Sequence, residues 1–473
     1  MQEFEYDGQW WLPENSENKI SGTLKFHPVE GAYLELIGSF KEYDDIVNSK
    51  FSHVDIILGI TTNNKLLTLY KCFLSKAKAS HSPDSSFVAT TFFANVVFIG
   101  CHFEKGEDIL FDSLSINYSH LEDWTGITGF RFARHDTDEQ TLCAISYKYP
   151  QKVEADLGSL KIVLNHEFTY GGPSFYEYNL KQTTYITMQP NQPMHFNGYK
   201  SDICYHIQNF LSLATGKATY PLAVKAKSKE NKKRLLGGKI FDDVYEDIFI
   251  FFSLKKLPDL SKKPHPSDVL FSYSDIADSF EKYLQNWVAK AEILRPVYDL
   301  YFGTLYNPSM YLEYQFLSLI QAVESYHRRK YGGQYLSDDD YSPIRNELIK
   351  AISQNISNDF KESLKKRLQY LNEYSLRKRL KEIFLKYAVI EKLLVESKEV
   401  FIEDVVNTRN YLTHYDKRLE IKKVSGQKLY RLNLIIKHII EICLLSELEM
   451  PEEMIVKLMT KICSYRYRNF EKW

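Results

Sequence analysis

The chain has 473 residues, of which 44% are hydrophobic, so it can bury the cores of two or three domains, and fibrous and disordered classes are excluded. Lysine and arginine total 60 against 61 aspartate and glutamate residues, so the charge balance neither requires nor excludes a nucleic-acid partner. Six cysteines without a Cys-x-x-Cys pair argue against a zinc site or a disulfide framework.

The start of the chain and its apolar runs bear on its location. The first residues lack the basic and apolar regions of a secretion signal, and the longest apolar runs, such as 248–252, are too short to span a bilayer. We therefore expect a cytoplasmic protein without a membrane partner.

Residues 10–192 have the pattern of a β domain. Gly, Asn, Asp and Pro separate short apolar runs at 23–26, 33–37, 54–60, 66–73, 92–99 and 161–164. Asn63-Asn64, between two of these runs, is a hairpin signal. Because no long amphipathic helix intervenes, the pattern predicts a sandwich or an open barrel. Asp123-Trp124-Thr125-Gly126 and Tyr170-Gly171-Gly172-Pro173 predict turns that expose aromatic side chains.

The segment that follows predicts a connection between two domains. Residues 201–213 have helical spacing with Ser201 as N-cap, the lysine-rich run 225–234 predicts a solvated loop, and 262–267 has the composition of a boundary. We expect a β-rich domain over 1–200, a helical and linker segment over 201–265, and a second domain over 266–473.

Beyond Asp268 the apolar residues recur at helical spacing, which predicts a helix bundle. Helices are expected over 280–294, ending before Pro296, around 316–323, over 360–374, 376–395, 401–413 and 430–447, and once more within 451–473. The predicted class is α+β multidomain, with a β-rich first half and an all-α second half.

The run from Asn407 to Tyr415 concentrates groups that suit metal-independent RNA cleavage. His414 can transfer a proton near neutral pH, and Arg409 offers a charged planar fork to phosphate oxygens. Asn410 and His414 share a helix face, whereas Arg409 and His414 diverge by about 140° on an ideal helix. This mismatch favours either a break near His414 or a site built from two copies. Alternatively, Arg409 pairs with Asp404 or another carboxylate, and His414 is favoured by the helix dipole.

Two stretches resemble the ApeA-type HEPN domain of bacterial anti-phage defence: residues 313–328, EYQFLSLIQAVESYHR, and 401–414, FIEDVVNTRNYLTH. The β-rich half resembles the domain that accompanies it. The resemblance implies that Arg409 and His414 carry a ribonuclease activity in a homodimer with composite sites. It also implies a structured RNA substrate, such as tRNA, and control by a phage-derived trigger protein or another infection signal acting on residues 1–200.

Further residues are candidates for support of this site. Glu324, His327 and Arg328 could act as second-layer or RNA-contact groups. Pairing Glu324 and His327 with His438 and Glu441 resembles a metal site but lacks bridging carboxylates, so we expect neither metal nor cofactor. Residues 361–381 hold eight basic and two acidic residues and suit an RNA backbone or a solvated face; the candidates are Lys365, Lys366, Arg367, Arg377 and Arg379.

The sequence therefore predicts an abortive-infection endoribonuclease in which the 2′-hydroxyl attacks the phosphate. Arg409, Asn410 and His414 are its expected catalytic residues, and the products should carry 2′,3′-cyclic phosphate and 5′-hydroxyl ends. The alternative is a catalytically silent HEPN module that binds RNA or a partner protein.

Overall fold

The computed structural model describes residues 1–41, 53–82, 85–136, 141–174, 176–234, 240–254, 264–265, 268–466 and 473. The chain forms two compact units: residues 1–211, 219–264 and 272–285 make the first, and residues 212–218, 265–271 and 286–473 make the second. The functional division at residues 200 and 265 stays a prediction. Among the described residues, no helix is both long and apolar enough to cross a membrane.

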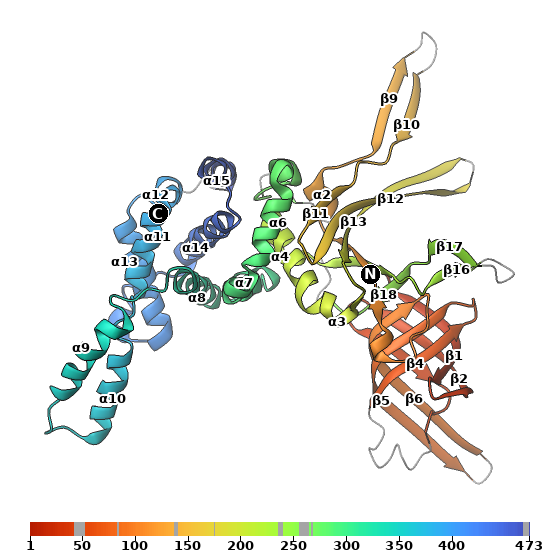
Figure 1. Cartoon of the computed structure of the whole chain (residues 1–473), viewed down its shortest axis with the longest axis horizontal. Coiled ribbons are helices and arrows are strands. Elements are labelled where there is room, and N and C mark those ends of the chain that lie inside the picture. Colours follow the sequence, from red (N-terminus) through yellow and green to blue (C-terminus); the bar gives the residue numbers. More distant parts are fainter. Residues whose placement is uncertain are drawn as a thin grey trace. The chain divides into compact units, whose positions relative to one another are not determined.

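A closed antiparallel barrel begins the first unit (Figure 1). Its strands are β1 (Phe4–Leu12), β2 (Asn15–His27), β3 (Gly31–Leu36), β4 (His53–Thr61), β5 (Leu66–Ser82) and β6 (Ser85–Ile99). They follow the order β6-β3-β2-β1-β4-β5, and β5 pairs back with β6. Alternate residues such as Trp10, Leu34 and Phe92 fill the interior. The barrel is therefore closed, where the sequence allowed a sandwich or an open barrel.

A second sheet grows from the same strand β6. On one edge of β6, residues 90–94 pair with β3 and residues 97–99 pair with β18 (Ile248–Phe251). The sheet then continues in the order β15 (Pro221–Lys227), β8 (Ser113–Tyr118), β13 (Glu177–Pro190), β12 (Leu160–Ser174) and β11 (Val153–Asp156). The barrel and this sheet therefore share one strand.

Short elements complete the first unit. Three strand pairs stand apart from the large sheet: β7 (Leu110–Phe111) with β14 (Met194–His195), β9 (Phe130–Asp136) with β10 (Thr141–Tyr147), and β16 (Lys232–Arg234) with β17 (Ile240–Tyr245). The expected hairpin at Asn63-Asn64 is confirmed, because it joins β4 to β5 and Asn64 has a φ of 60°. The 3-10 helices of this unit are Gly106–Asp108 and Ala277–Ser279, and a further one, Lys417–Leu419, lies in the second unit.

The two predicted turns were wrong. Residues 123–126 close helix α2 (Leu121–Thr125), with Gly126 in the left-handed region at φ 61°. Trp124 is 1% exposed and lies against Phe210 and Phe280. Residues 170–173 belong to β12, in which Tyr170 and Gly171 pair with β13 and the register shifts between Gly171 and Ser174. Tyr170 is exposed as expected, but it lies in a strand. A helix-ending glycine and a strand glycine produce the same sequence signal as a turn.

The segment after residue 195 also differs from the prediction. Helical structure begins at α3 (Phe196–Gly198), continues as a π-helix (Tyr199–Ile203) and ends in α4 (Cys204–Thr215). The His195 ring, rather than Ser201, caps its start by accepting from the Asn197 N–H. Lys225, expected in a solvated loop, is nearly buried in β15, where its ammonium contacts the carboxylates of Glu167 and Asp247. The two carboxylates compensate the lost hydration.

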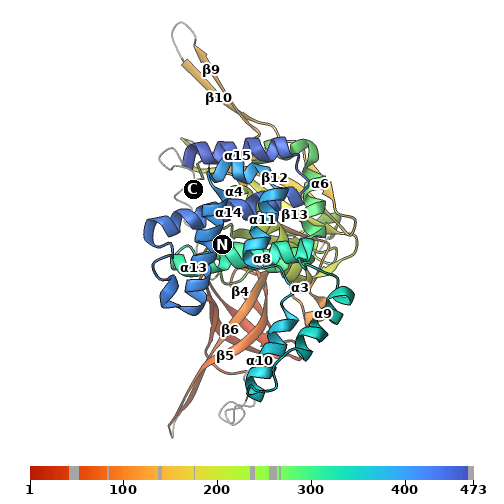
Figure 2. The same ribbon diagram turned by 90° about the vertical axis from the view of Figure 1, so that its left-hand side faces the viewer.

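The second unit is the expected helix bundle (Figures 1 and 2). Its helix α8 (Leu312–Tyr331) packs against α7, α11, α13 and α14. The bundle also contains α7 (Ala291–Tyr306), α9 (Asp338–Lys350), α10 (Asn358–Gln369), α11 (Leu376–Lys386), α12 (Ala388–Leu394), α13 (Lys398–His414), α14 (Gly426–Glu447) and α15 (Glu452–Arg466). Helix α5 (Tyr273–Ile276) and most of α6 (Phe280–Ala289) belong to the first unit.

Several helices differ from the predicted ones; the helix expected over 360–374, for example, ends at Gln369. The helix expected over 280–294 is interrupted at Lys290, which separates α6 from α7. Pro296 lies inside α7 instead of ending a helix. The expected helix 376–395 is divided at Tyr387 into α11 and α12. Helix α9 was not predicted, although Ser337 followed by three aspartates is a capping signal.

We expect Gly59→Ala to lower the free energy of unfolding by about 1–3 kcal/mol, as overpacking of a core does. A Cβ atom at Gly59 would lie 2.2 Å from the ring of Trp10, which is fully buried in the barrel. The matched control is Gly171→Ala, because a Cβ there meets nothing within 4 Å. Urea unfolding of the two variants measures the difference, and equal stabilities would contradict the packing assigned to Trp10.

Candidate active site at the end of helix α13

Helix α13 places the Arg-Asn-x-x-x-His motif at its exposed end. Ser397 caps the start of the helix, and Phe401, Ile402, Val405 and Thr408 are buried in the bundle. The helix ends at His414, because Tyr415 adopts the left-handed conformation with φ 51° and ψ 35°. His414 is therefore the last helical residue and is exposed to solvent.

The segment after α13 folds back onto the motif helix. The Thr408 hydroxyl accepts a hydrogen bond of 2.9 Å from the Val424 N–H in a buried position. The Lys423 ammonium lies 4.0 Å from the centre of the Tyr411 ring. These contacts hold the last turns of α13 against residues 423–424. The backbone that carries the motif is therefore fixed in position.

Arg409 is positioned by neighbours on two helices. Its Nη2 lies 3.7 Å from Glu324 Oε2 on α8, and its Nη1 donates to Asn410 Oδ1 over 3.3 Å. The sequence allowed a pairing with Asp404 or another carboxylate, and the carboxylate that Arg409 meets is that of Glu324. The side chain of Arg409 is 34% exposed, so the guanidinium remains accessible to a bound phosphate.

An ionised carboxylate lies beside His414. Asp416 accepts hydrogen bonds from Arg418, with Oδ2 2.7 Å from Nη2. These bonds hold the pKa of Asp416 at about 2, with a smaller contribution from His414. Sequence analysis missed Asp416 and Arg418, although both follow the motif directly in the chain.

His327 and Arg379 do not lie on an RNA-facing surface, which corrects their place among the RNA-contact candidates. Both side chains are only 1% exposed, and the Arg379 Nη1 lies 3.1 Å from His327 Nδ1. Arg379 donates further bonds to the carbonyls of Gly332 and Tyr374. From the sequence alone, a long cationic side chain is expected at the surface. The Arg379 side chain instead donates hydrogen bonds to backbone carbonyls, one of them at the end of α8.

The other basic candidates keep accessible positions. Arg328 is exposed and pairs with Glu373 at 2.8 Å. Lys365 pairs with Glu362 on its own helix at 2.8 Å. Lys366, Arg367 and Arg377 are exposed, and in the described part of the chain no ion pair engages them.

The carboxylate–histidine pairs considered for a metal lie in separate places. His438 Nδ1 and Glu441 Oε2 are 2.5 Å apart in the bundle interior, and the Tyr301 hydroxyl donates to the same carboxylate over 2.7 Å. Glu324 and His327 contact Arg409 and Arg379 instead. Among the described residues, no group of three or more histidine, cysteine or acidic side chains could hold a metal ion.

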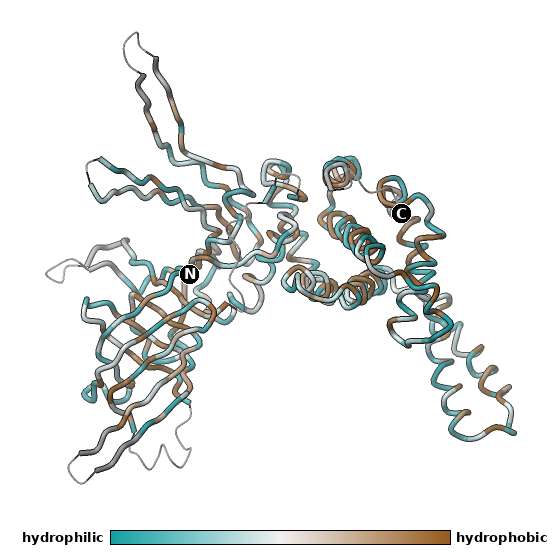
Figure 3. Tube along the Cα trace, turned by 180° about the vertical axis from the view of Figure 1, so that it is seen from behind, coloured by the Kyte–Doolittle hydropathy of each residue, from teal (hydrophilic) through white to brown (hydrophobic). Residues whose placement is uncertain are grey.

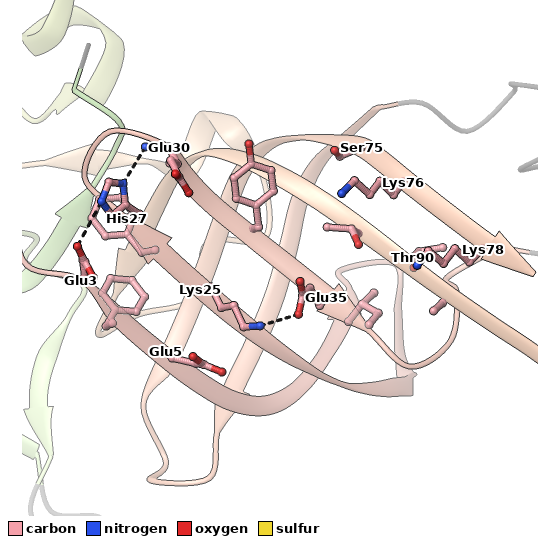
Figure 4. Close-up of a pocket in the computed structure, with 17 residues that line it drawn as sticks. Glu3, Glu5, Lys25, His27, Glu30, Glu35, Ser75, Lys76, Lys78 and Thr90 are labelled. Atoms are coloured by element: carbon pink, nitrogen blue, oxygen red, sulfur yellow. Dashed lines mark hydrogen bonds and ion pairs between the residues drawn. The ribbon is translucent and has the colours of Figure 1, made fainter. Parts of the chain in front are cut away.

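The first unit carries an open pocket of about 860 Å³ on the barrel strands (Figure 4). Its lining has both signs of charge. Lys25 pairs with Glu35 at 2.9 Å, and His27 lies 3.3 Å from Glu3. Lys76 and Lys78 lie at another part of the lining (Figure 4). A lining with both acidic and basic side chains suits a ligand that carries both positive and negative groups better than a simple anion.

Acid should destabilise the chain through His327. Burial, followed by the nearby Arg379 charge, lowers the pKa of His327 from 6.5 to about 4. As pH falls the unfolded chain is protonated first, so this contribution is complete above pH 6.5 and is lost between pH 6.5 and 4. The loss should be on the order of 3 kcal/mol. His327→Asn should remove this part of the pH dependence, as measured by urea unfolding at pH 7, 5.5 and 4. The same pH dependence in both proteins would contradict the assignment.

Two family models match the chain. ApeA N-terminal domain 1 matches residues 5–287, and Apea-like HEPN matches residues 317–454, which include Glu324, Arg409 and His414. No curated protein and no solved structure matches it. The expected resemblance is confirmed over most of the sequence, with the β-rich module preceding the helical one. The chain accordingly belongs to the ApeA family, in which an HEPN domain follows the ApeA N-terminal domain.

Proposed function

We propose that this chain is a metal-independent endoribonuclease that acts in anti-phage defence by abortive infection. The ApeA-like HEPN family suggests a defence nuclease, and HEPN domains are generally ribonucleases. The observation that carries the proposal is the grouping of Arg409, Asn410 and His414 at the exposed end of α13, with Arg409 positioned by Glu324.

The proposed reaction is an internal transfer within RNA. The ribose 2′-oxygen bonds to the adjacent phosphorus and its proton passes to a base, while the bond from phosphorus to the 5′-oxygen breaks and that oxygen receives a proton. His414 performs one of these proton transfers. Arg409 neutralises the charge on the phosphorane, and Asn410 holds a phosphate oxygen or Arg409 itself. The products carry 2′,3′-cyclic phosphate and 5′-hydroxyl ends.

A second copy supplies the other half of the site in this proposal. In a homodimer formed through the HEPN domain, each site combines Arg409 of one copy with His414 of the other. Such a composite site also accommodates the divergence of about 140° between Arg409 and His414 on one helix.

Control and substrate complete the proposal. The substrate is RNA, such as tRNA or another structured RNA, in the cytoplasm. Arg377, which lies outside helix α10, offers exposed positive charge to its backbone. Residues 1–200 act as the sensor of a phage-derived protein or another infection signal, and residues 266–473 act as the nuclease. The pocket of Figure 4 offers the sensor a binding surface.

A silent HEPN module is the second candidate function. The contact between Arg409 and Glu324 favours it to the extent that the pair merely joins α13 to α8. In that case Arg409 and His414 bind RNA or a partner protein without cleaving RNA.

His414→Ala should abolish cleavage of total cellular RNA while folding and assembly remain as in the wild type, because the imidazole is exposed at a helix end. Cleavage by the wild type should persist in EDTA. End-labelling of the fragments should detect 5′-hydroxyl ends, and treatment with a cyclic phosphodiesterase should detect the cyclic phosphate.

The matched control is Glu420→Ala, which removes an exposed side chain just after the motif. It should cleave at the wild-type rate. A folded His414→Ala protein that cleaves as fast as this control would favour the silent module. Loss of cleavage in EDTA that returns with a divalent ion would contradict the metal-independent reaction.

A mixture of Arg409→Ala and His414→Ala chains should recover activity if each composite site takes one residue from each copy. Random pairing then leaves one intact site in a mixed dimer. We expect recovery to roughly a quarter of the wild-type rate, since about half of the dimers are mixed and each has one of two sites. Cleavage measured after subunit exchange tests this. Recovery absent from dimers proven to be mixed would contradict the shared site.

A further inference from the structure

Helices α9 and α10, with the residues between them, form a hairpin that projects from the helical bundle in Figures 1 and 2. We call residues 337–371 the arm. Ser337 caps the first helix and Ser357 caps the second. The Tyr341 hydroxyl donates to the Leu368 carbonyl, so the two helices contact each other.

The base of the arm is fixed to the bundle. Asn372 is nearly buried, and its side chain both donates to the Leu336 carbonyl over 2.8 Å and accepts from the Leu336 N–H over 3.0 Å. Arg379 binds the carbonyls of Gly332 and Tyr374 just beyond. The arm therefore leaves the bundle from a defined base.

The arm has no sealed core of its own. Neither α9, with 13 residues, nor α10, with 12 residues, has a buried side chain. Ile344, Leu348 and Phe360 are 44%, 39% and 48% exposed. Apolar residues recur along both helices (Figure 3). Helices of this length are marginal in water and draw their stability from packing. Because no side chain of α9 or α10 is buried, the arm of a single copy lacks such a packing partner.

The two helices carry opposite charge. In α9, Asp338, Asp339, Asp340 and Glu347 outweigh Arg345 and Lys350, four against two, for a net charge of −2. In α10, Lys361, Lys365, Lys366 and Arg367 outweigh Asp359 and Glu362, four against two, for a net charge of +2. Within the arm, every residue of which the structure describes, the ion pair formed is Lys365 with Glu362 on the same helix. Within the fully described arm, no ion pair therefore joins α9 to α10.

We propose that the arm docks onto the arm of a second copy, with α9 beside the second copy's α10 around a two-fold axis. Two such hairpins make a four-helix bundle, in which the apolar side chains gain a common core and each acidic helix faces a basic one. RNA would match α10 but would be repelled by the aspartates of α9. The inference rests on the proposed function in one respect, that the chain acts as a dimer, and it adds the arm to the surface that joins the two copies.

Two charge-reversed full-length chains test this surface. One carries Asp339→Lys and Glu347→Lys, and the other carries Lys366→Glu and Arg367→Glu; these positions avoid the caps and the pair of Lys365 with Glu362. Each variant alone places like charges across the axis, so its dimer dissociation constant should rise about 10- to 100-fold. An equimolar mixture should associate again as a mixed dimer, because both of its contacts then join opposite charges. Sedimentation velocity over a dilution series measures all three samples.

A second measurement covers the case in which a reversed helix fails to form, which circular dichroism would reveal. A photoreactive phenylalanine derivative replaces Leu348 in the full chain, and the cross-linked peptides are identified by mass spectrometry. Cross-links should join position 348 to residues 358–371 of a differently isotope-labelled copy. Cross-links confined to one copy, or to surfaces outside the arm, would overturn the proposal.

Other outcomes also decide the matter. A monomeric wild type, or reversed variants that dimerise like the wild type, would overturn the docking surface. So would reversal of α10 that weakens RNA binding and leaves dimerisation unchanged, which would assign the arm to RNA. Cleavage and dimerisation measured on the same proteins separate the two proposals. A wild type that dimerises but does not cleave RNA rejects only the nuclease. A wild type that cleaves RNA, with both reversed variants still dimeric, rejects only the arm.

Discussion

The buried guanidinium of Arg379 is the interaction on which the helical unit most depends. Its removal from water is costly unless its donors find acceptors. It finds them in the carbonyls of Gly332 and Tyr374 and in the ring of His327. In doing so it joins the end of α8, the base of the arm and α11. Helix α8 also carries Glu324, which contacts Arg409, so one helix supports both the arm and the motif.

The motif combines a rigid base with accessible chemistry. Thr408, Val405 and Phe401 anchor α13 in the bundle, while Arg409 and His414 lie where the helix ends. In the proposed function, the fixed backbone limits the loss of conformational freedom on binding a phosphate, and the partial exposure of Arg409 leaves its fork available. In one copy the arginine is engaged by Glu324.

The sequence predicted regular elements better than it predicted side-chain surroundings. Apolar periodicity located α13 and the barrel strands other than β1, because a buried face imposes its period directly on the residues. The same logic failed for α9, whose half-exposed apolar residues repeat only weakly, and for Trp124, because a glycine that ends a helix looks like a turn. Arg379 and Lys225 were expected in solvent, since their burial depends on acceptors far away in the chain. Glu324 and Arg409, 85 positions apart, could be associated only through the family resemblance.

Strand β6 determines how rigidly the barrel is joined to the second sheet of the first unit. It belongs to the barrel through β5 and β3 and to the second sheet through β18, so the two parts cannot slide or separate without breaking its hydrogen bonds. The strands β15 and β18 lie beyond residue 200, yet they fill the space between β8 and β6. A fragment ending at residue 200 would leave both of those edges bare, and bare edges recruit strands from other molecules. The unit from barrel to second sheet is thus one mechanical body, in which a load applied at the barrel reaches β11 through continuous backbone pairing.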